Sequence, residues 1–155
     1  QHIDPCLLIQ KPADRMILQA ERGGVTLSYD CPADLPLVFA DPDRISQVFI
    51  NLIHNAIKFT PNGGRIHVTA YQNGQMVVFK VSDNGVGIAQ KDITRIFERF
   101  YKADRARAGG GTGLGLSICR HTVETHGGKI WAESVENSGA DFYFSIPVVY
   151  PEKQN

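Results

Sequence analysis

The stretch from Asp41 to Phe59 carries the strongest hydrophobic pattern in the chain. Its apolar residues recur at the three- and four-residue spacing of a helix with one buried stripe: Ile45, Val48, Phe49, Leu52, Ile53 and Ala56. Asp41 can cap free backbone N–H groups and Pro42 suits the first helical position, so the helix is expected to begin there. Pro61 predicts that it ends at about Phe59.

Shorter patterns predict the remaining elements. Helical spacing predicts helices over 4–22, where Pro12 interrupts the pattern, and near 90–97 and 113–125. Alternating or continuous apolar runs predict strands at 25–29, 65–71, 75–82, 129–134 and 141–146, with a further short apolar run at 37–40. Most of these strands are neighbours in sequence, and Asn73-Gly74 predicts a hairpin. This order favours an α+β fold, a two-layer sandwich of helices on a sheet.

Length and charge limit the alternatives. A chain of 155 residues, 43% of them hydrophobic, can bury one core and is too short for two ordinary domains. We therefore expect one domain over residues 1–150, with the chain fraying after Pro147 and a tail at 151–155. Lys and Arg together number 16, as do Asp and Glu, so no general basic surface argues for nucleic acid. No apolar run approaches the ~20 residues that span a bilayer.

Three cysteines, Cys6, Cys31 and Cys119, form no Cys-x-x-Cys motif. Their odd number predicts reduced thiols in the cytosol rather than a disulfide framework. Cys119, His121 and His126 are close enough in sequence to suggest a zinc site. This spacing on an amphipathic helix is more often structural, so no metal–thiolate chemistry is expected.

Asn51, Asn55 and Lys58 follow their own helical spacing beside the buried stripe. Two amides and an ammonium stacked in this way could meet a triphosphate and its metal, because an Asn carbonyl oxygen suits Mg²⁺. An ordinary solvated face is the alternative. Asn is a poor residue for a helix interior, which favours a functional explanation.

The strand at 75–82 continues into a second candidate motif, Asp83-Asn-Gly85-Val-Gly87. Its apolar residues of one parity, which Asp83 continues, are Val77, Phe79 and Val81. The Asp83 carboxylate should therefore face the hydrophobic layer, where the exocyclic amine of adenine is a suitable donor to it. Gly85 and Gly87 would let the backbone turn and approach the base. A capping Asp in an Asn-Gly turn is the alternative.

A third cluster, residues 109–115, is rich in glycine and ends where an amphipathic pattern begins. Backbone N–H groups at such a junction bind phosphate well. No Gly-Lys-Ser/Thr follows, so it is not a P-loop, and the spacing is not Gly-x-Gly-x-x-Gly either. A flexible linker is the alternative.

Taken together, the motifs resemble the N, G1, F and G2 boxes of the catalytic ATP-binding domain of bacterial two-component sensor histidine kinases. The four segments are Asn51…Asn55-Ala-x-Lys58-Phe-Thr-Pro, Asp83-Asn-Gly-Val-Gly-Ile, Ile96-Phe97-Glu-Arg-Phe100-Tyr-Lys102 and Gly111-Thr-Gly113-Leu-Gly115-Leu. The resemblance covers nearly the whole chain. It implies the Bergerat fold of the GHKL superfamily, a mixed and mostly antiparallel sheet under three helices, with ATP bound beneath a mobile lid.

The resemblance also implies roles for individual residues. Asn55 would bind Mg²⁺, with Asn51 beside it, and Asp83 would accept from the adenine amine. Residues that would contact the base or the phosphates are Lys58, Phe59, Gly85, Gly87, Ile88, Lys102, Arg105, Gly111, Thr112, Gly113, Leu114, Gly115 and Leu116. The lid would span 102–112. Many relatives have Gly-Ser/Thr-Thr-Phe where this chain has Gly139-Ala140-Asp141-Phe142, which puts in doubt a contact of Asp141 with adenine.

The family's phosphoacceptor His lies on a separate dimerisation domain and is usually followed by an acidic residue. No His here has that neighbour: His2, His54, His67, His121 and His126. The resemblance thus implies a cytoplasmic half-enzyme, free or part of a membrane-bound sensor. It would bind ATP and Mg²⁺ as a monomer, within a homodimeric parent that serves a response regulator.

Two other functions in the same superfamily remain alternatives. Gyrase-like, MutL-like and chaperone ATPases place a water-activating Glu four residues before the metal-binding Asn, where this chain has Asn51. An anti-sigma-factor Ser kinase shares the nucleotide site. The segment from Phe97 to Lys102 argues against it.

Overall fold

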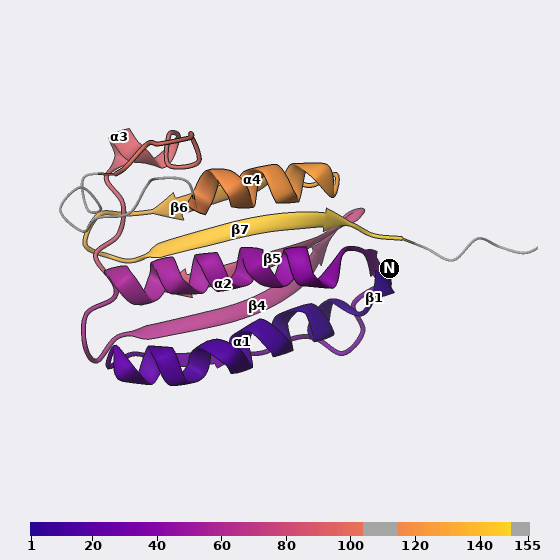
Figure 1. Ribbon diagram of the computed structural model, residues 1–155, viewed down its shortest axis with the longest axis horizontal. Helices are drawn as coiled ribbons and strands as arrows, with labels where there is room; N and C mark the ends of the chain where they lie inside the picture. Colours follow the sequence, from indigo (N-terminus) through magenta and orange to yellow (C-terminus); the bar gives the residue numbers. More distant parts are fainter. Residues whose placement is uncertain (104–114, 150–155) are drawn as a thin grey trace, which may run out of the picture.

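The computed structural model describes residues 1–103 and 115–149, and it has helices packed on one face of a sheet (Figure 1). The helices are α1 (Pro5–Arg22), α2 (Pro42–Phe59), α3 (Gln90–Ile93) and α4 (Gly115–Thr125). The strands are β1 (His2–Ile3), β2 (Thr26–Tyr29), β3 (Val38–Phe39), β4 (Arg65–Asn73), β5 (Met76–Asp83), β6 (Ile130–Ser134) and β7 (Ala140–Pro147).

Five strands form the main sheet, in the order β2-β4-β5-β7-β6. β2 and β4 pair in parallel, whereas the β4–β5, β5–β7 and β6–β7 pairs are antiparallel. The long helices α1, α2 and α4 lie side by side over this sheet (Figure 1). The predicted α+β sandwich with a mixed, mostly antiparallel sheet is therefore confirmed.

An aromatic cluster fixes α2 above the centre of the sheet. Phe49 of α2 contacts Phe79 of β5 and Phe144 of β7 with ring centroids 5.4 and 5.0 Å apart, and all three side chains are fully buried. Each buried aromatic side chain contributes about 1.5–3 kcal/mol through the hydrophobic effect. Because the apolar face of α2 is buried against the sheet, the adjacent face, with Asn51, Asn55 and Lys58, is available for the predicted nucleotide site.

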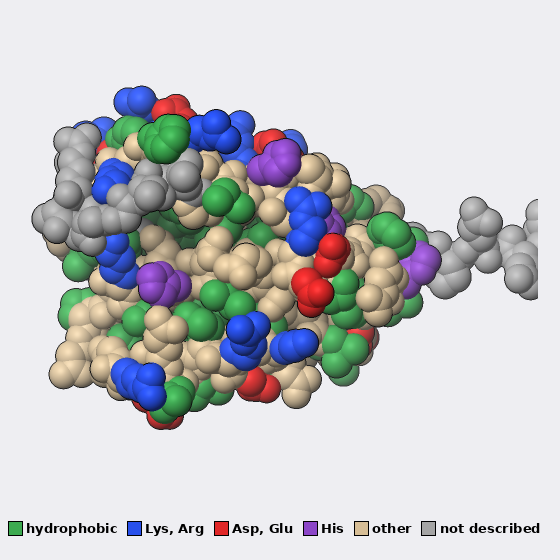
Figure 2. All heavy atoms as spheres, viewed as in Figure 1, with side chains coloured by type: hydrophobic (Ala, Val, Ile, Leu, Met, Phe, Trp, Pro, Cys, Tyr) green, Lys and Arg blue, Asp and Glu red, His purple; other side chains and the backbone are tan. Residues whose placement is uncertain are grey.

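Charges on the visible face of the molecule are of both signs and scattered (Figure 2). They gather into no single basic area there, in keeping with a net charge of zero. Among the helices of residues 1–103 and 115–149, none combines the length and the apolarity needed to cross a bilayer.

α1 begins at its Asp4 cap, whose carboxylate accepts from the backbone N–H of Cys6, and it runs unbroken to Arg22. Pro12 does not interrupt it. The Pro12 ring is buried with Leu8 and Met16 on the core face, so the residue joins the apolar stripe. Packing of that stripe compensates for the hydrogen bond that a proline removes from a helix interior.

The short strand β1 was not predicted from the sequence. It pairs antiparallel with β3, with His2 opposite Phe39. The segment around β3 also contacts the two residues that follow β7: Val38 bridges Val148, and the N–H of Val149 donates to the carbonyl of Leu37. The prediction that the chain frays after Pro147 is therefore wrong for these two residues, while the predicted tail at 151–155 lies outside the described part of the chain.

The helix predicted over 90–97 is shorter in the structure. After Ile93 the backbone continues in turns, with hydrogen bonds from residue 95 to 92, from 98 to 95 and from 101 to 98. The buried Asp92 accepts from the hydroxyl of Tyr101, and Phe97 packs edge-on against Phe142. These tertiary contacts draw the segment down onto the sheet and prevent a regular helix.

The prediction of three reduced thiols is wrong for two of them. Cys6 at the start of α1 and Cys31 after β2 form a disulfide, with Cα atoms 5.6 Å apart. Helix α1 packs along β2, which brings together cysteines 25 positions apart in the sequence. Cys119 is free and buried.

Candidate nucleotide-binding site

Two contacts show that α2 and α4 run antiparallel. Near the start of α2, the N–H of Asp41 donates to the Nε2 of His126, just beyond the end of α4. In the middle, the Nδ2 of Asn51 donates to the Sγ of Cys119 at 3.6 Å. One further turn along each helix reaches Asn55 on α2 and Gly115 on α4. The amide face of α2 and the glycine-rich start of α4, predicted from separate motifs, therefore lie at the same end of the sandwich.

Asn51 is held between the two helices. Its Oδ1 accepts from the Nε2 of Gln47 at 2.8 Å, and its Nδ2 donates to Cys119. Burial raises the pKa of the Cys119 thiol to about 11, so the thiol stays protonated at neutral pH. Both ends of the Asn51 amide are thus engaged by protein groups.

Asn55 differs from Asn51 in its surroundings. Among the described residues, its Nδ2 is buried and has no hydrogen-bond partner. A buried unsatisfied donor is costly, and a phosphate oxygen would satisfy it while the amide oxygen reached a cation. Lys58, one turn further, is exposed, with its Nζ 5.4 Å from the centroid of the half-buried Phe59 ring. This end of α2 fits a phosphate with its metal.

The carboxylate of Asp83 lies where the alternation predicted. Asp83 ends β5 on the face covered by helices and is 6% exposed. Its Oδ1 accepts from the backbone N–H of Gly85 at 2.9 Å, so Asp83 does cap the turn that follows it, as the alternative interpretation predicted. A carboxylate has about four lone-pair sites, which leaves capacity for a ligand donor besides this bond.

Gly85 and Gly87 are required by the protein's own backbone. A Cβ at Gly85 would lie 2.2 Å from the carbonyl oxygen of Phe59. Gly87 has φ +72° and a Cβ there would lie 2.4 Å from the carbonyl oxygen of Val135. The N–H of Val86 donates to the Phe59 carbonyl. Residues 83–87, here called the Asp83 loop, therefore lie directly against the end of α2.

Two residues near this loop were missed by sequence reasoning. Ser134 accepts from the N–H of Ile88 and donates to the carbonyl of Gly139, while Ile88 itself is a core residue, 1% exposed. Thr60 is 5% exposed, and among the described residues its Oγ1 has no partner. The apolar pattern of the strand that Ser134 ends, and the helix end that precedes Thr60, do not indicate that either hydroxyl belongs to the site.

Ala140, and not Asp141, is the residue that lies beside Asp83 at the predicted adenine site. In the β5–β7 register Asp141 is opposite Ser82 and Ala140 is opposite Asp83. Residues opposite one another share a face of the sheet, so Ala140 lies beside Asp83. Asp141 is on the other face, where it accepts from the Ser82 hydroxyl and lies 4.0 Å from the Lys80 Nζ.

Several predicted site residues lie outside the described chain: Arg105, Gly111, Thr112, Gly113 and Leu114, with most of the predicted lid at 102–112. Lys102 is half-buried, just before that segment. Gly115 is exposed and Leu116 half-buried at the start of α4.

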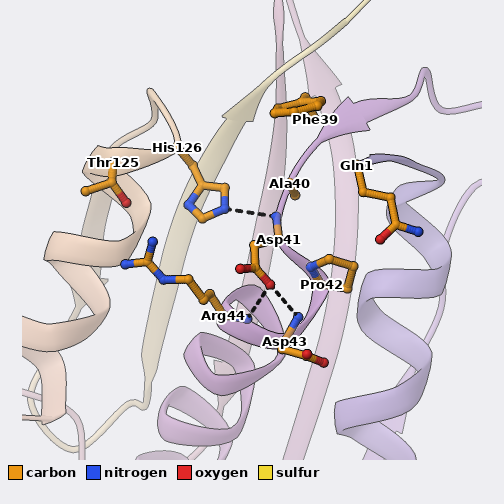
Figure 3. Close-up of a pocket in the computed structure, with 9 residues that line it drawn as sticks. All are labelled: Gln1, Phe39, Ala40, Asp41, Pro42, Asp43, Arg44, Thr125 and His126. Atoms are coloured by element: carbon orange, nitrogen blue, oxygen red, sulfur yellow. Dashed lines mark hydrogen bonds between the residues drawn. The ribbon is translucent and has the colours of Figure 1, made fainter.

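A separate cavity of about 540 Å³ lies at the opposite end of α2. Two of its lining side chains, those of Asp41 and His126, are already bonded within the protein, as Figure 3 shows: the Asp41 carboxylate caps α2 through the N–H groups of Asp43 and Arg44, and His126 accepts from the N–H of Asp41. The Nδ1 of His126 also lies 2.7 Å from the Thr122 carbonyl, and Cys119 is buried on α4 with its Sγ against α2. Neither residue is therefore arranged as a zinc ligand, and no residue predicted for the nucleotide lines this cavity.

Comparison with known proteins defines the class to which this fold and site belong. Residues 40–150 match the family of histidine kinase-, DNA gyrase B- and HSP90-like ATPases, and the chain belongs to that family. Relatives of the chain within this family include sensor histidine kinases. The adaptive-response sensory kinase SasA of Nostoc is 44% identical over 139 residues, covering 89% of this chain and 33% of SasA.

Solved histidine kinases share the fold. The catalytic domain of ThkA superposes with a TM-score of 0.82 at 34% identity, covering 96% of this chain and 97% of that domain. Full-length ShkA, in complex with AMPPNP, gives a TM-score of 0.86 at 30% identity, covering 99% of this chain and 32% of ShkA. ThkA is also known in complex with the response regulator TrrA. This chain spans about a third of the length of SasA and ShkA.

Proposed function

We propose that this chain binds Mg²⁺-ATP and presents the γ-phosphate to a histidine on a separate dimerisation domain of the same parent protein. The observation that carries the proposal is the convergence of three motifs, distant in sequence, at one end of α2: the Asn55 amide, the Asp83 loop and the start of α4. The AMPPNP complex of ShkA, a relative of the same fold, supports a nucleotide in this role.

Different residues of the chain would bind different parts of the nucleotide. Asp83 would accept from the adenine amine, Lys58 would approach the phosphates and Asn55 would share Mg²⁺ with phosphate oxygens. Phe59, the glycines and the segment at 102–116 would enclose the nucleotide. Bound Mg²⁺ supplies positive charge that offsets the charge developing on the transferring phosphoryl group.

The parent protein is then a homodimeric, cytoplasmic kinase or the cytoplasmic part of a membrane-bound one, and this chain alone is monomeric. The phosphate would pass from the histidine to an aspartate of a response regulator. The ThkA–TrrA complex supports a response regulator as the partner class. The net charge of zero gives no support to nucleic acid as a further partner.

Asn51 favours this function over a hydrolytic ATPase. An amide does not act as a general base toward water. In the structure that amide is also tied to Gln47 and Cys119. The anti-sigma-factor Ser kinase alternative gains no specific observation from the fold.

The metal assignment predicts a selective defect. In Asn55→Ala the gain in ATP affinity that Mg²⁺ provides should fall by ~10-fold or more, the size of effect that even an outer-shell metal partner produces. Affinity for metal-free ATP should fall much less, because only the bond from the Asn55 Nδ2 to a phosphate oxygen is then lost. Calorimetric titrations with Mg²⁺ and with chelator measure both quantities.

His54→Ala is the matched control, because His54 is the exposed neighbour of Asn55 on the same helix. It should keep the full effect of Mg²⁺. An equal loss of affinity with and without metal in Asn55→Ala would instead make Asn55 a structural residue, or a nucleotide contact that takes no part in binding the metal.

A further inference from the structure

We propose that Cys6 and Cys31 form a thiol–disulfide exchange site, which reacts reversibly with low-molecular-weight thiols and their disulfides. The inference rests on the proposed function, because an ATP-using domain works in the cytosol. Disulfides there are rare, and those that occur are usually transient, catalytic or redox-sensing. A permanent structural bond would conflict with that compartment, whereas an exchangeable one does not.

The surroundings of the pair accommodate both redox states. The carbonyl oxygen of Pro32 lies 3.3 Å from the Sγ of Cys6 and 3.7 Å from the Sγ of Cys31. A disulfide sulfur has no proton to donate, but a thiol at either position finds this acceptor in place. Both cysteines are also half-buried, so a small thiol can reach them.

Cys119 provides an internal contrast within the same chain. It is fully buried on α4, against α2, and burial raises the pKa of its thiol to about 11 from 9.0. Its thiolate fraction at neutral pH is therefore roughly 100-fold smaller than that of an unperturbed thiol. Exchange should be confined to the Cys6–Cys31 pair.

The exchange begins when a thiolate attacks one of the two sulfurs, and attack on Cys31 serves as the example. An incoming thiolate bonds to the Cys31 sulfur, the S–S bond breaks and Cys6 leaves as a thiolate that takes up a proton. A second thiolate then attacks the mixed disulfide and releases Cys31. Two low-molecular-weight thiols supply the two electrons and end as one disulfide, and the reverse sequence oxidises the pair.

The test equilibrates the whole chain with reduced and oxidised glutathione in varied ratios and then alkylates it under native conditions. Mass spectrometry should show Cys6 and Cys31 passing together from protected to fully alkylated as reduced glutathione increases, with Cys119 protected throughout. A bond that survives a large excess of reduced glutathione would overturn the proposal. So would two thiols that oxidised glutathione never joins.

Single variants give the matched controls. Cys6→Ser and Cys31→Ser should each accumulate a mixed disulfide with glutathione on the remaining partner, whereas Cys119→Ala should exchange like the parent chain. ATP affinity measured on the same samples separates the two proposals. Intact exchange without ATP binding contradicts the proposed function alone, and normal ATP binding without exchange contradicts the redox site alone.

Discussion

Asp83→Asn should lower ATP affinity by roughly 100-fold while leaving the domain folded. A hydrogen bond to a charged group contributes about 1.5–3 kcal/mol, and an unmatched adenine amine adds a desolvation cost, so a loss near 3 kcal/mol corresponds to this factor. The Asn oxygen can still accept from the N–H of Gly85, which the Asp83 Oδ1 accepts in the wild-type chain. Asp83→Ala removes that bond too, so the Asn variant separates binding from folding.

Asp141→Asn is the control for this prediction. Asp141 lies on the strand beside β5, but on the opposite face of the sheet from Asp83. Its loss should leave ATP affinity within about twofold, as surface substitutions usually have small effects. Calorimetric titration gives the affinities and thermal melts verify the fold. Near-normal ATP binding by Asp83→Asn would remove Asp83 from the adenine site.

The second large effect is that the chain alone should catalyse neither its own phosphorylation nor the hydrolysis of ATP. We expect the chain alone to bind ATP yet neither phosphorylate itself nor release inorganic phosphate above the level of ATP in buffer. Asn51 cannot act as the general base that a hydrolytic relative needs. Labelled ATP incubated with the chain, followed by separation of protein, nucleotide and phosphate, measures both reactions.

The histidines give a structural reason for the absence of self-phosphorylation. Both ring nitrogens of His126 have partners, in the Thr122 carbonyl and the Asp41 N–H. His67 lies against Ser28 and Asp30, and His2 stacks edge-on against Phe39. His54 and His121 are exposed on helices without an acidic residue after them. Acid-labile phosphate on any of these would contradict the expectation.

Elements with a strong local pattern were predictable from the sequence. The apolar stripe, the Asp41 cap and Pro61 gave α2 nearly to the residue, since each signal acts within one or two turns. The alternation in β5 correctly predicted that Asp83 faces the helices. Local sequence could not predict β1, because a two-residue strand exists only through its pairing with β3.

The errors arose where contacts between distant residues decide the structure. The Cys6–Cys31 bond depends on the packing of α1 along β2, which cysteine counting does not reveal. The turns after α3 depend on Asp92, Tyr101 and Phe97. The position beside Asp83 belongs to Ala140 because of the β5–β7 register, which the sequence does not state.

The most direct test of the central claim is phosphoryl transfer between separate proteins. Labelled ATP, Mg²⁺ and this chain are incubated with the dimerisation domain of the parent protein, which carries the phosphoacceptor histidine. We expect weak but clear labelling of that histidine, because separate halves lack the local concentration that a linker provides, and no labelling with Asp83→Asn. Rapid release of inorganic phosphate, or acid-labile phosphate on this chain instead of on the added domain, would contradict the account.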